Sequence, residues 1–419
     1  MNSHRHKLVS LSPWTFIPTL YFAQGVPNTI INTVSVILYK RLGISNQEIT
    51  FWTSLLNLPW VLKMLWAPFV DTNSTKRTWM LTMQLGMFAC LGLIALSLQL
   101  PNFFVISLVI FAVAAFISAT YDIATDGFYM LALSSEQQAF FVGFRSLFFR
   151  LAMLFGSGFL VFLTGKLEIY LNNIRLAWMA TFGLVSILFV LLFIYHRLVL
   201  PEPDLDQPRQ KNINQEISFG IIVKSYFKQA KIIAILAFIL LYRLGEAMLV
   251  KLASLFLLDP IEEGGLGLST DTVGLVYGTF GVISLISGGI LGGLLISRYG
   301  LRKCLLPMAL ALNIPDIFYV YMAAVKPYLL LVYPLVALEQ FGYGLGFTGF
   351  TVYLLYLCKG EYKTSHYAIS TGLMALGLML PGAISGAIQK SIGYTSFFIL
   401  VCFFTIPGMI SIFFIPLEE

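Results

Sequence analysis

The residues best suited to chemistry are ten ionisable side chains that lie inside long apolar stretches. A charge at the centre of a bilayer costs about 2.5 to 3.5 kcal/mol on insertion scales, so such residues are expected to face a cavity or an oppositely charged partner. Five are acidic and five are basic, which favours pairing within the protein. The ten residues are Lys63, Asp122, Asp126, Arg145, Arg150, Arg243, Glu246, Lys251, Asp316 and Glu339.

Asp122 and Asp126 are four residues apart, which places both carboxylates on one face of a helix. Two desolvated carboxylates that repel each other have a raised proton affinity. The next apolar stretch returns after a short turn, so we expect Arg145 near the depth of Asp126 and Arg150 near that of Asp122. An arginine neighbour also stabilises an ionised carboxylate. These four residues therefore fit a static clamp between two helices and a proton or gating switch equally well.

Further polar residues lie at mid-depth in other apolar stretches. Arg243 and Glu246 share a helix face, and Glu339 lies at a similar depth in a later stretch. Asp316 follows a proline, and the sequence assigns it no role. We interpret this polar set as the lining of a substrate or proton pathway, to which Gln24, Asn28, Lys63, Tyr242, Gln340 and Tyr343 also belong.

The composition excludes a water-soluble globule. Of the 419 residues, 58% are hydrophobic and 11% are charged, against roughly a quarter charged in soluble domains, and the mean hydropathy is +0.84. The net charge of +6 comes from scattered residues, which argues against nucleic-acid binding. The sequence has no GxxxxGK[ST] loop and no HExxH pair. We therefore expect a non-enzyme without metal or cofactor.

A bilayer-spanning helix needs about 20 predominantly apolar residues, and twelve such stretches can be drawn. The expected fold class is an all-α membrane protein with twelve transmembrane helices in two parallel six-helix bundles. The stretches lie near residues 14–38, 49–69, 79–99, 103–132, 139–164, 176–197, 230–258, 271–296, 303–324, 328–357, 365–389 and 394–415.

Loop charges predict the orientation. With the N-terminus inside, fifteen Lys and Arg residues lie on the cytoplasmic side, and six, beginning with Lys40 and Arg41, lie opposite. This asymmetry predicts that both termini are cytoplasmic. A polar linker at 201–229 divides the chain into six-helix halves at 1–200 and 230–419. A weak internal repeat supports the division, because Gly43-Ile44-Ser45 matches Gly267-Leu268-Ser269.

Two charged loops at equivalent places in the halves predict a cytoplasmic gate whose ion pairs break when the halves rock. The same residues also fit plain topological anchors. The first loop contains Asp71, Lys76 and Arg77, and the second contains Arg298, Arg302 and Lys303.

Several segments resemble the AmpG muropeptide permease family of the major facilitator superfamily, in the group that also holds acetyl-coenzyme A transporters. The most specific is LKMLWAPFVD at 62–71, which is similar to the family element that ends the second span. YDIATDG at 121–127 resembles the paired-aspartate motif, although Tyr121 replaces the common glutamine. The segments FRLAML at 149–154, Tyr242-Arg243, YFAQGVP at 21–27 and LEQF at 338–341 also fit.

The resemblance implies proton-driven import of anhydromuropeptides, the wall-recycling fragments, across the bacterial inner membrane by a multi-pass carrier. It implies functional roles for Lys63, Asp122, Asp126, Arg150 and Arg243. The expected partners are a small sugar-peptide substrate, protons and lipid, with the protein as a monomer. Two alternatives stay open: a permease for siderophores or other peptide-like solutes, and a non-transporting sensor of wall fragments.

Overall fold

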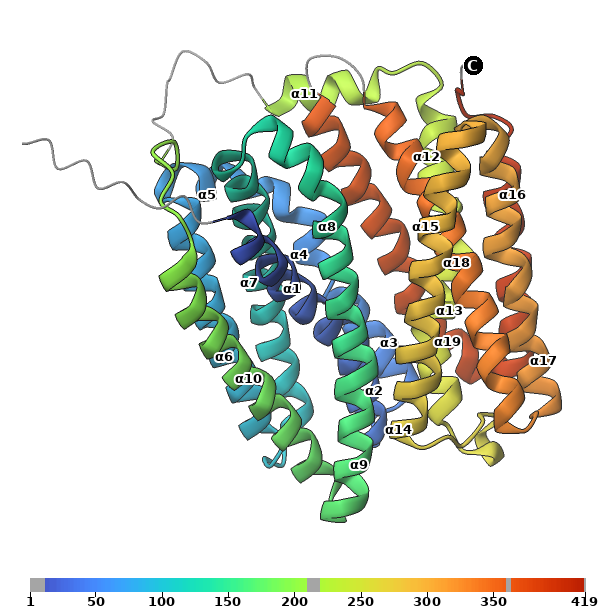
Figure 1. The fold of residues 1–419 in the computed structure, drawn as a ribbon. Coiled ribbons are helices and arrows are strands. Elements are labelled where there is room, and N and C mark those ends of the chain that lie inside the picture. Colours follow the sequence, from blue (N-terminus) through green and yellow to red (C-terminus); the bar gives the residue numbers. More distant parts are fainter. Residues whose placement is uncertain (1–11, 209–218, 359–362, 418–419) are drawn as a thin grey trace, which may run out of the picture.

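The protein is a bundle of long helices. A computed structural model describes residues 12–208, 219–358 and 363–417, and this part of the chain contains helices, turns and no β-strand. Five of the basic residues counted for the cytoplasmic side, Arg5, Lys7, Arg209, Lys211 and Lys359, lie outside the described residues. Figure 1 shows α11 (Phe219–Phe227) and the C-terminus at one end of the bundle, with α9 (Val161–Leu171) and α14 (Thr270–Val273) at the other.

The residues before the linker form the N-terminal half. Its elements are η1 (Pro13–Thr15), α1 (Ile17–Thr29), η2 (Ile30–Val34), α2 (Ser35–Arg41), α3 (Asn46–Leu55), α4 (Leu58–Leu62), η3 (Lys63–Leu65), α5 (Ala67–Asn73), α6 (Lys76–Ser97), α7 (Phe103–Ala132), α8 (Ser135–Met153), η4 (Leu154–Leu160), α9 (Val161–Leu171) and α10 (Ile174–Val199).

The C-terminal half follows α11 (Phe219–Phe227). Its elements are α12 (Ile232–Leu241), α13 (Leu244–Leu258), η6 (Ile261–Glu263), α14 (Thr270–Val273), η7 (Gly274–Gly281), α15 (Val282–Tyr299), α16 (Leu301–Asn313), η8 (Ile314–Asp316), α17 (Ile317–Val325), α18 (Leu329–Leu357) and α19 (Lys363–Ser411).

Nine helical stretches of the described residues are long and apolar enough to cross a membrane. The first two expected spans are not among these nine, and each consists of several short helical elements. The eleventh and twelfth expected spans lie within α19, where Gly393 has a φ of 74° that separates two helical segments. The nine stretches are therefore consistent with the twelve that the sequence predicts.

The helix ends follow local sequence signals. Ser134 and Gln137 form a capping box at the start of α8, in which each side chain accepts a hydrogen bond from the other residue's backbone N–H. Ser45, Thr75 and Asn173 cap α3, α6 and α10 through their side-chain oxygens. These caps fix where the α2–α3, α5–α6, α7–α8 and α9–α10 turns lie.

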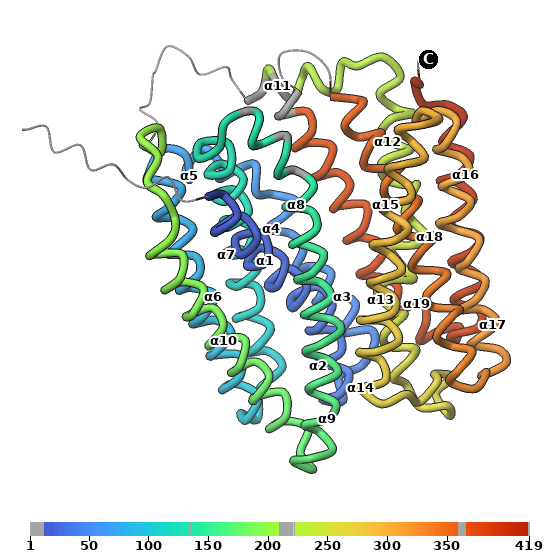
Figure 2. Tube along the Cα trace, in the orientation of Figure 1, coloured from blue at the N-terminus to red at the C-terminus, as the bar shows by residue number. Residues whose placement is uncertain are grey.

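The two halves meet closely at one end of the bundle. There α3 packs against α19, α9 against α14, and η4 against η7, and Figure 2 shows the chain of the two halves converging at α9 and α14. The largest buried apolar cluster joins both halves and includes Leu38 and Leu252. Two further clusters, around Phe128 and around Phe350, each belong to a single half. The halves are therefore packed together at the α9–α14 end and have separate cores at the α11 end.

Glycines allow the closest approach between the halves. A Cβ atom on Gly278 would lie 1.8 Å from the carbonyl oxygen of Ser157, and one on Gly158 would lie 2.9 Å from the carbonyl oxygen of Gly278. Both glycines lie in π-helical segments, η4 and η7, which pack on each other. Backbone therefore touches backbone at this crossing, and no larger residue fits there.

We expect Gly278→Val to lower the free energy of unfolding by about 1 to 3 kcal/mol, because the added side chain collides with backbone atoms that cannot move aside. Thermal unfolding in detergent measures the loss. Gly183→Ala is the control, since a Cβ atom on Gly183 in α10 meets nothing within 4 Å. Equal unfolding temperatures for the two variants would contradict the tight crossing.

Candidate functional site

A cavity of about 590 Å³ lies between the two halves. Its walls come from α1 and α8 of the N-terminal half and from α15 and α18 of the C-terminal half. Its volume is within the range of small-molecule sites. Five of the residues expected in the pathway line it: Gln24, Asn28, Arg145, Arg150 and Tyr343.

Asp126 is held at the edge of this cavity by a cation and a phenol. Arg145 Nη2 donates to Asp126 Oδ1 at 2.6 Å, and the hydroxyl of Tyr21 donates to the same oxygen at 3.2 Å. The Arg145 guanidinium also lies 4.7 and 4.9 Å from the ring centroids of Tyr21 and Tyr129. The expected pairing of Arg145 with Asp126 is confirmed.

Asp122 has a different set of partners from the one expected. Trp60 Nε1 donates to Asp122 Oδ2 at 2.9 Å, and Lys63 Nζ lies 3.7 Å from that oxygen. The guanidinium of Arg150 instead lies over Gly289 of the other half, where a Cβ atom would come within 3.0 Å of Arg150 Nη1. Lys63 therefore compensates the charge of Asp122, and Arg150 bridges the cavity toward α15.

Arg243 stands at the break between α12 and α13. Its Nη2 donates to the hydroxyl of Tyr343 at 2.6 Å, and its guanidinium lies 4.9 Å from the ring centroid of Phe347. Within the described residues, Arg243 Nε and Arg150 Nη1 are buried without a hydrogen-bond acceptor. The two arginines thus offer unused donors close to the cavity, which suits an anionic group.

The other expected pathway residues of the C-terminal half lie behind the cavity wall. The ring of Tyr242 stacks on Phe350, with centroids 5.0 Å apart, and its hydroxyl donates to the Gly346 carbonyl at 3.1 Å. Glu246 and Glu339 are fully buried. Gln340 Nε2 donates to Glu339 at 3.0 Å. None of these four side chains lines the cavity in this conformation.

The first charged loop is bonded to its own half and to the start of the linker. Lys76 forms an ion pair with Asp71, and Arg77 forms one with Glu202 at 3.1 Å. Asp206 accepts from the backbone N–H groups of Lys76 and Arg77, at 2.7 and 3.0 Å. In the second loop, the Arg298 guanidinium lies 5.4 Å from the ring centroid of Tyr299, while Arg302 and Lys303 are exposed. The gate role of these six residues stays a prediction.

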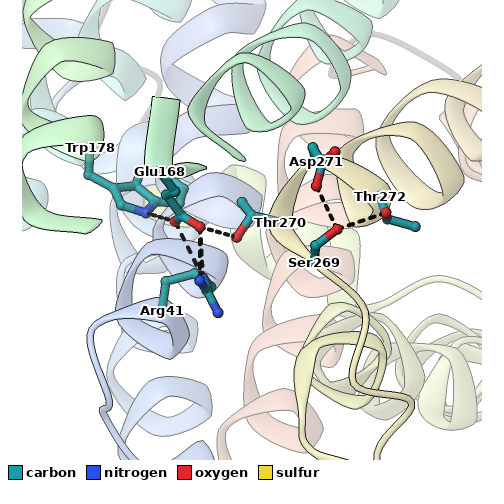
Figure 3. A network of polar contacts seen from close by, with 7 residues as sticks. All are labelled: Arg41, Glu168, Trp178, Ser269, Thr270, Asp271 and Thr272. Carbon is teal, nitrogen blue, oxygen red and sulfur yellow. Dashed lines mark hydrogen bonds and ion pairs between the residues drawn. The ribbon is translucent and has the colours of Figure 1, made fainter. Parts of the chain in front are cut away.

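The halves are joined by polar contacts at the opposite end, which we name the latch: Lys40, Arg41, Lys166, Glu168, Asp259 and Asp271. In its first part, Glu168 accepts from Arg41 Nη2 and Trp178 Nε1, both at 2.9 Å, and from the hydroxyl of Thr270 at 2.8 Å (Figure 3). Thr270 belongs to the other half. Lys166 Nζ also crosses the boundary, to Asp271 Oδ2 at 2.7 Å.

The second part of the latch centres on Asp259, whose side chain is 1% exposed. Lys40 of the N-terminal half forms an ion pair with it, and Asn46 Nδ2 donates to it at 2.8 Å. The hydroxyl of Tyr394 donates to Asp259 as well. One buried carboxylate therefore gathers donors from both halves.

Sequence reasoning missed the latch because it read Lys40, Arg41 and Lys166 only as loop charges. The signal was present, since opposite charges flank spans that end on the same side of the bilayer. The sequence also left Asp316 unexplained. A search of the described residues for groups of His, Cys, Asp and Glu arranged to hold a metal ion finds none.

Sequence comparisons give a family and full-length relatives. The family model named Major Facilitator Superfamily matches residues 19–359. The anhydromuropeptide permease of Escherichia coli K12 is 26% identical over 399 residues, covering 93% of this chain and 77% of that protein. The putative transporter AmpG 4 of Rickettsia felis is 25% identical over 404 residues and covers 93% of each chain. The resemblance expected from the motifs is confirmed.

Solved structures share the fold. A bacterial homologue of the human lysosomal transporter Spinster, in an inward-facing and unoccupied conformation, superposes with a TM-score of 0.70 at 15% identity, covering 95% of both chains. A D-xylose-proton symporter gives 0.68 at 12% identity, covering 96% of this chain and 97% of that one. At these identities the likeness shows the fold alone, and it confirms the expected all-α class.

We expect Asp259→Asn to open the latch, because removing one charge of a buried pair costs about 2 to 5 kcal/mol. The distance between the halves is measured with two spin labels, in a chain whose native cysteines have been replaced. The labels are attached to cysteines introduced at Tyr170 and Ile261, which are exposed and lie on opposite halves. The distance distribution should gain a longer component. The control is Asp204→Asn, because Asp204 is exposed on the linker. A distance distribution that Asp259→Asn leaves unchanged would show that the latch does not keep the two halves together.

Proposed function

Because the chain belongs to the Major Facilitator Superfamily, we propose that it is a proton-coupled importer of anhydromuropeptides that works by alternating access. The observation that carries the proposal is the central cavity between the halves, lined by arginines, amides and tyrosines. The similarity to an anhydromuropeptide permease, which covers 93% of this chain and 77% of that protein, supports the substrate class.

The cavity chemistry suits a sugar joined to a peptide. Tyr343 and Phe149 line the cavity with aromatic rings of the kind on which sugar rings pack. Gln24 and Asn28 supply amide donors and acceptors for hydroxyl and peptide groups. Arg150 has a buried Nη1 without an acceptor among the described residues, which suits a peptide carboxylate. The cavity thus offers one partner for each part of a muropeptide.

The uneven contact between the halves supports alternating access. The latch closes one end, where the cores of both halves merge, whereas at the other end Lys76 pairs with Asp71 and Arg77 pairs with Glu202 of the linker. We propose that residues 1–200 and 230–419 rock about the Gly158–Gly278 crossing and that the latch breaks when the loops close. The Asp126–Arg145 pair then works as a switch at the cavity edge.

The membrane arrangement completes the proposal. Both termini lie in the cytoplasm, as the loop charges indicate, and the latch then faces the outside of the bacterial inner membrane. In this orientation the structure represents a state that is closed to the outside. The protein works as a monomer, because one chain supplies both walls of the cavity.

The direct experiment is uptake of labelled anhydromuropeptide into proteoliposomes. We expect accumulation above the external concentration when the two sides differ in pH, and only equilibration when they do not. An unlabelled siderophore and an unlabelled simple peptide serve as competitors. No uptake of the labelled fragment under either condition would reject the substrate, and equal uptake under both would reject proton coupling.

We expect Arg243→Lys to weaken substrate binding by about tenfold, because lysine keeps the charge but loses the planar two-point contact. Equilibrium binding of the labelled fragment to detergent-solubilised protein measures the change. Arg197→Lys is the matched control, because Arg197 is exposed on α10, away from the cavity. Unchanged affinity in Arg243→Lys would mean that this guanidinium only clamps the helices.

A further inference from the structure

Three carboxyl groups from separate segments of the C-terminal half are buried together. Glu246 comes from α13, Asp316 from η8 and Glu339 from α18. They are 0%, 1% and 1% exposed. Electrostatic interactions join Glu246 to both of the others, and Asp316 to Glu339. We name Glu246, Asp316 and Glu339 the acid triad.

Two members of the acid triad have no hydrogen-bond donor. Among the described residues, both carboxyl oxygens of Glu246 and both of Asp316 are buried without a partner. Only Glu339 is bonded, by Gln340 Nε2 at 3.0 Å and by the hydroxyl of Tyr319 at 3.5 Å. An ionised carboxylate left without donors in a low-dielectric interior is far costlier than a neutral acid.

Among the described residues, one cation acts on the acid triad. Arg243 is the basic group whose charge acts on Glu246, and it also donates to Tyr343. The other titratable groups that face the acid triad come from η7, α17, α18 and α19 and are neutral acids: Tyr277, Tyr319, Tyr343 and Cys402. One guanidinium balances one negative charge, so the remaining carboxyl groups are uncompensated unless they carry protons.

The acid triad lies one side chain away from the cavity. Tyr343 lines the cavity and interacts electrostatically with both Glu246 and Glu339. The helices are also interrupted here, between α12 and α13 next to Glu246 and at η8 beside Asp316. Discontinuous helices at mid-membrane are where carriers of this architecture hold their coupling ions. A short path therefore connects cavity water with buried carboxyl groups.

We propose that the acid triad is the proton-binding site of this carrier, and that its proton occupancy decides whether Arg243 can bind an anionic group of the substrate. The inference rests on the proposed proton-coupled transport and gives that coupling a place in the C-terminal half. The ligand is a proton, delivered by hydronium from the cavity and released to water on the opposite side.

The proton step balances without any other reactant. A hydronium ion transfers its proton to a carboxylate oxygen of Glu246, which leaves water and a neutral carboxylic acid. Arg243 then loses its internal counter-charge and is free to pair with a substrate carboxylate. When the proton leaves, the negative charge of Glu246 attracts Arg243 again, and the substrate carboxylate dissociates. Because linkage is reciprocal, bound substrate also holds the proton.

The carboxylates of the N-terminal half are less suited to this role. Asp126 is bonded to Arg145 and Tyr21, and Asp122 is bonded to Trp60 and lies near Lys63. Each of these two carboxylates has a cation and at least one hydrogen-bond donor beside it, whereas Glu246 and Asp316 have no donor among the described residues. In this proposal, the N-terminal half contributes ion pairs that change partners, and the C-terminal half contributes the site that binds the proton.

The first test needs no substrate. Infrared difference spectra of the purified full-length chain, recorded as pH is raised, detect the carbonyl band of protonated carboxylic acids. We expect this band in the native protein and its loss in the triple variant Glu246→Gln, Asp316→Asn and Glu339→Gln. Asp204→Asn, on the linker, should keep it. A band that persists in the triple variant overturns the proposal.

The second test uses labelled anhydromuropeptide in proteoliposomes, with exchange and pH-driven accumulation measured on the same vesicles. Native exchange should fall as pH rises, because the deprotonated acid triad holds Arg243. In Glu246→Gln, which mimics the protonated acid, exchange should become independent of pH and pH-driven accumulation should disappear. Asp316→Asn is made in parallel, so a variant that fails to insert does not decide the result.

The outcomes separate this proposal from the proposed function. If native protein does not transport the labelled fragment, the substrate is wrong, and the infrared test still decides whether the acid triad holds protons. If Glu246→Gln and Asp316→Asn accumulate the fragment as native protein does, the acid triad is not the coupling site. Loss of accumulation in Asp126→Asn alone would assign coupling to the N-terminal half instead.

Discussion

The cost of an unpaired charge in a low-dielectric interior is the constraint on which the rest of this structure depends. In the N-terminal half this cost is reduced by ion pairing, since Asp122 and Asp126 each have a cation nearby. The C-terminal half gathers three buried carboxyl groups, on which Arg243 is the acting cation among the described residues, and we propose that protons supply the missing compensation. Under this proposal, one half uses ion pairs and the other uses protonation, which gives the two halves different roles.

Packing decides where these charges meet water. Gly158 and Gly278 bring the backbones of the two halves into contact, and the latch adds ion pairs on one side of that crossing. The cavity lies between the halves, where their walls are formed by polar and aromatic side chains.

Much of the fold was predictable because its signals are local. Hydropathy located the membrane helices, and capping residues such as Ser134 marked their ends. The four-residue spacing of Asp122 and Asp126, followed by a short turn, correctly predicted that Arg145 reaches Asp126. The partner of Asp122 was not predicted, because Lys63 reaches it from a helix that is broken at η3, and a break changes which way a side chain points.

The sequence by itself determined the membrane environment, the helical class, the family and the identity of the buried charges, because composition, periodicity and motifs are carried by neighbouring residues. Only the tertiary structure decided which charges meet. Asn46 and Asp259 are 213 positions apart and share a hydrogen bond, and Asp316 had no assigned role until it was found beside Glu246 and Glu339. Contacts between distant segments depend on how whole helices tilt and break, and no local pattern encodes that.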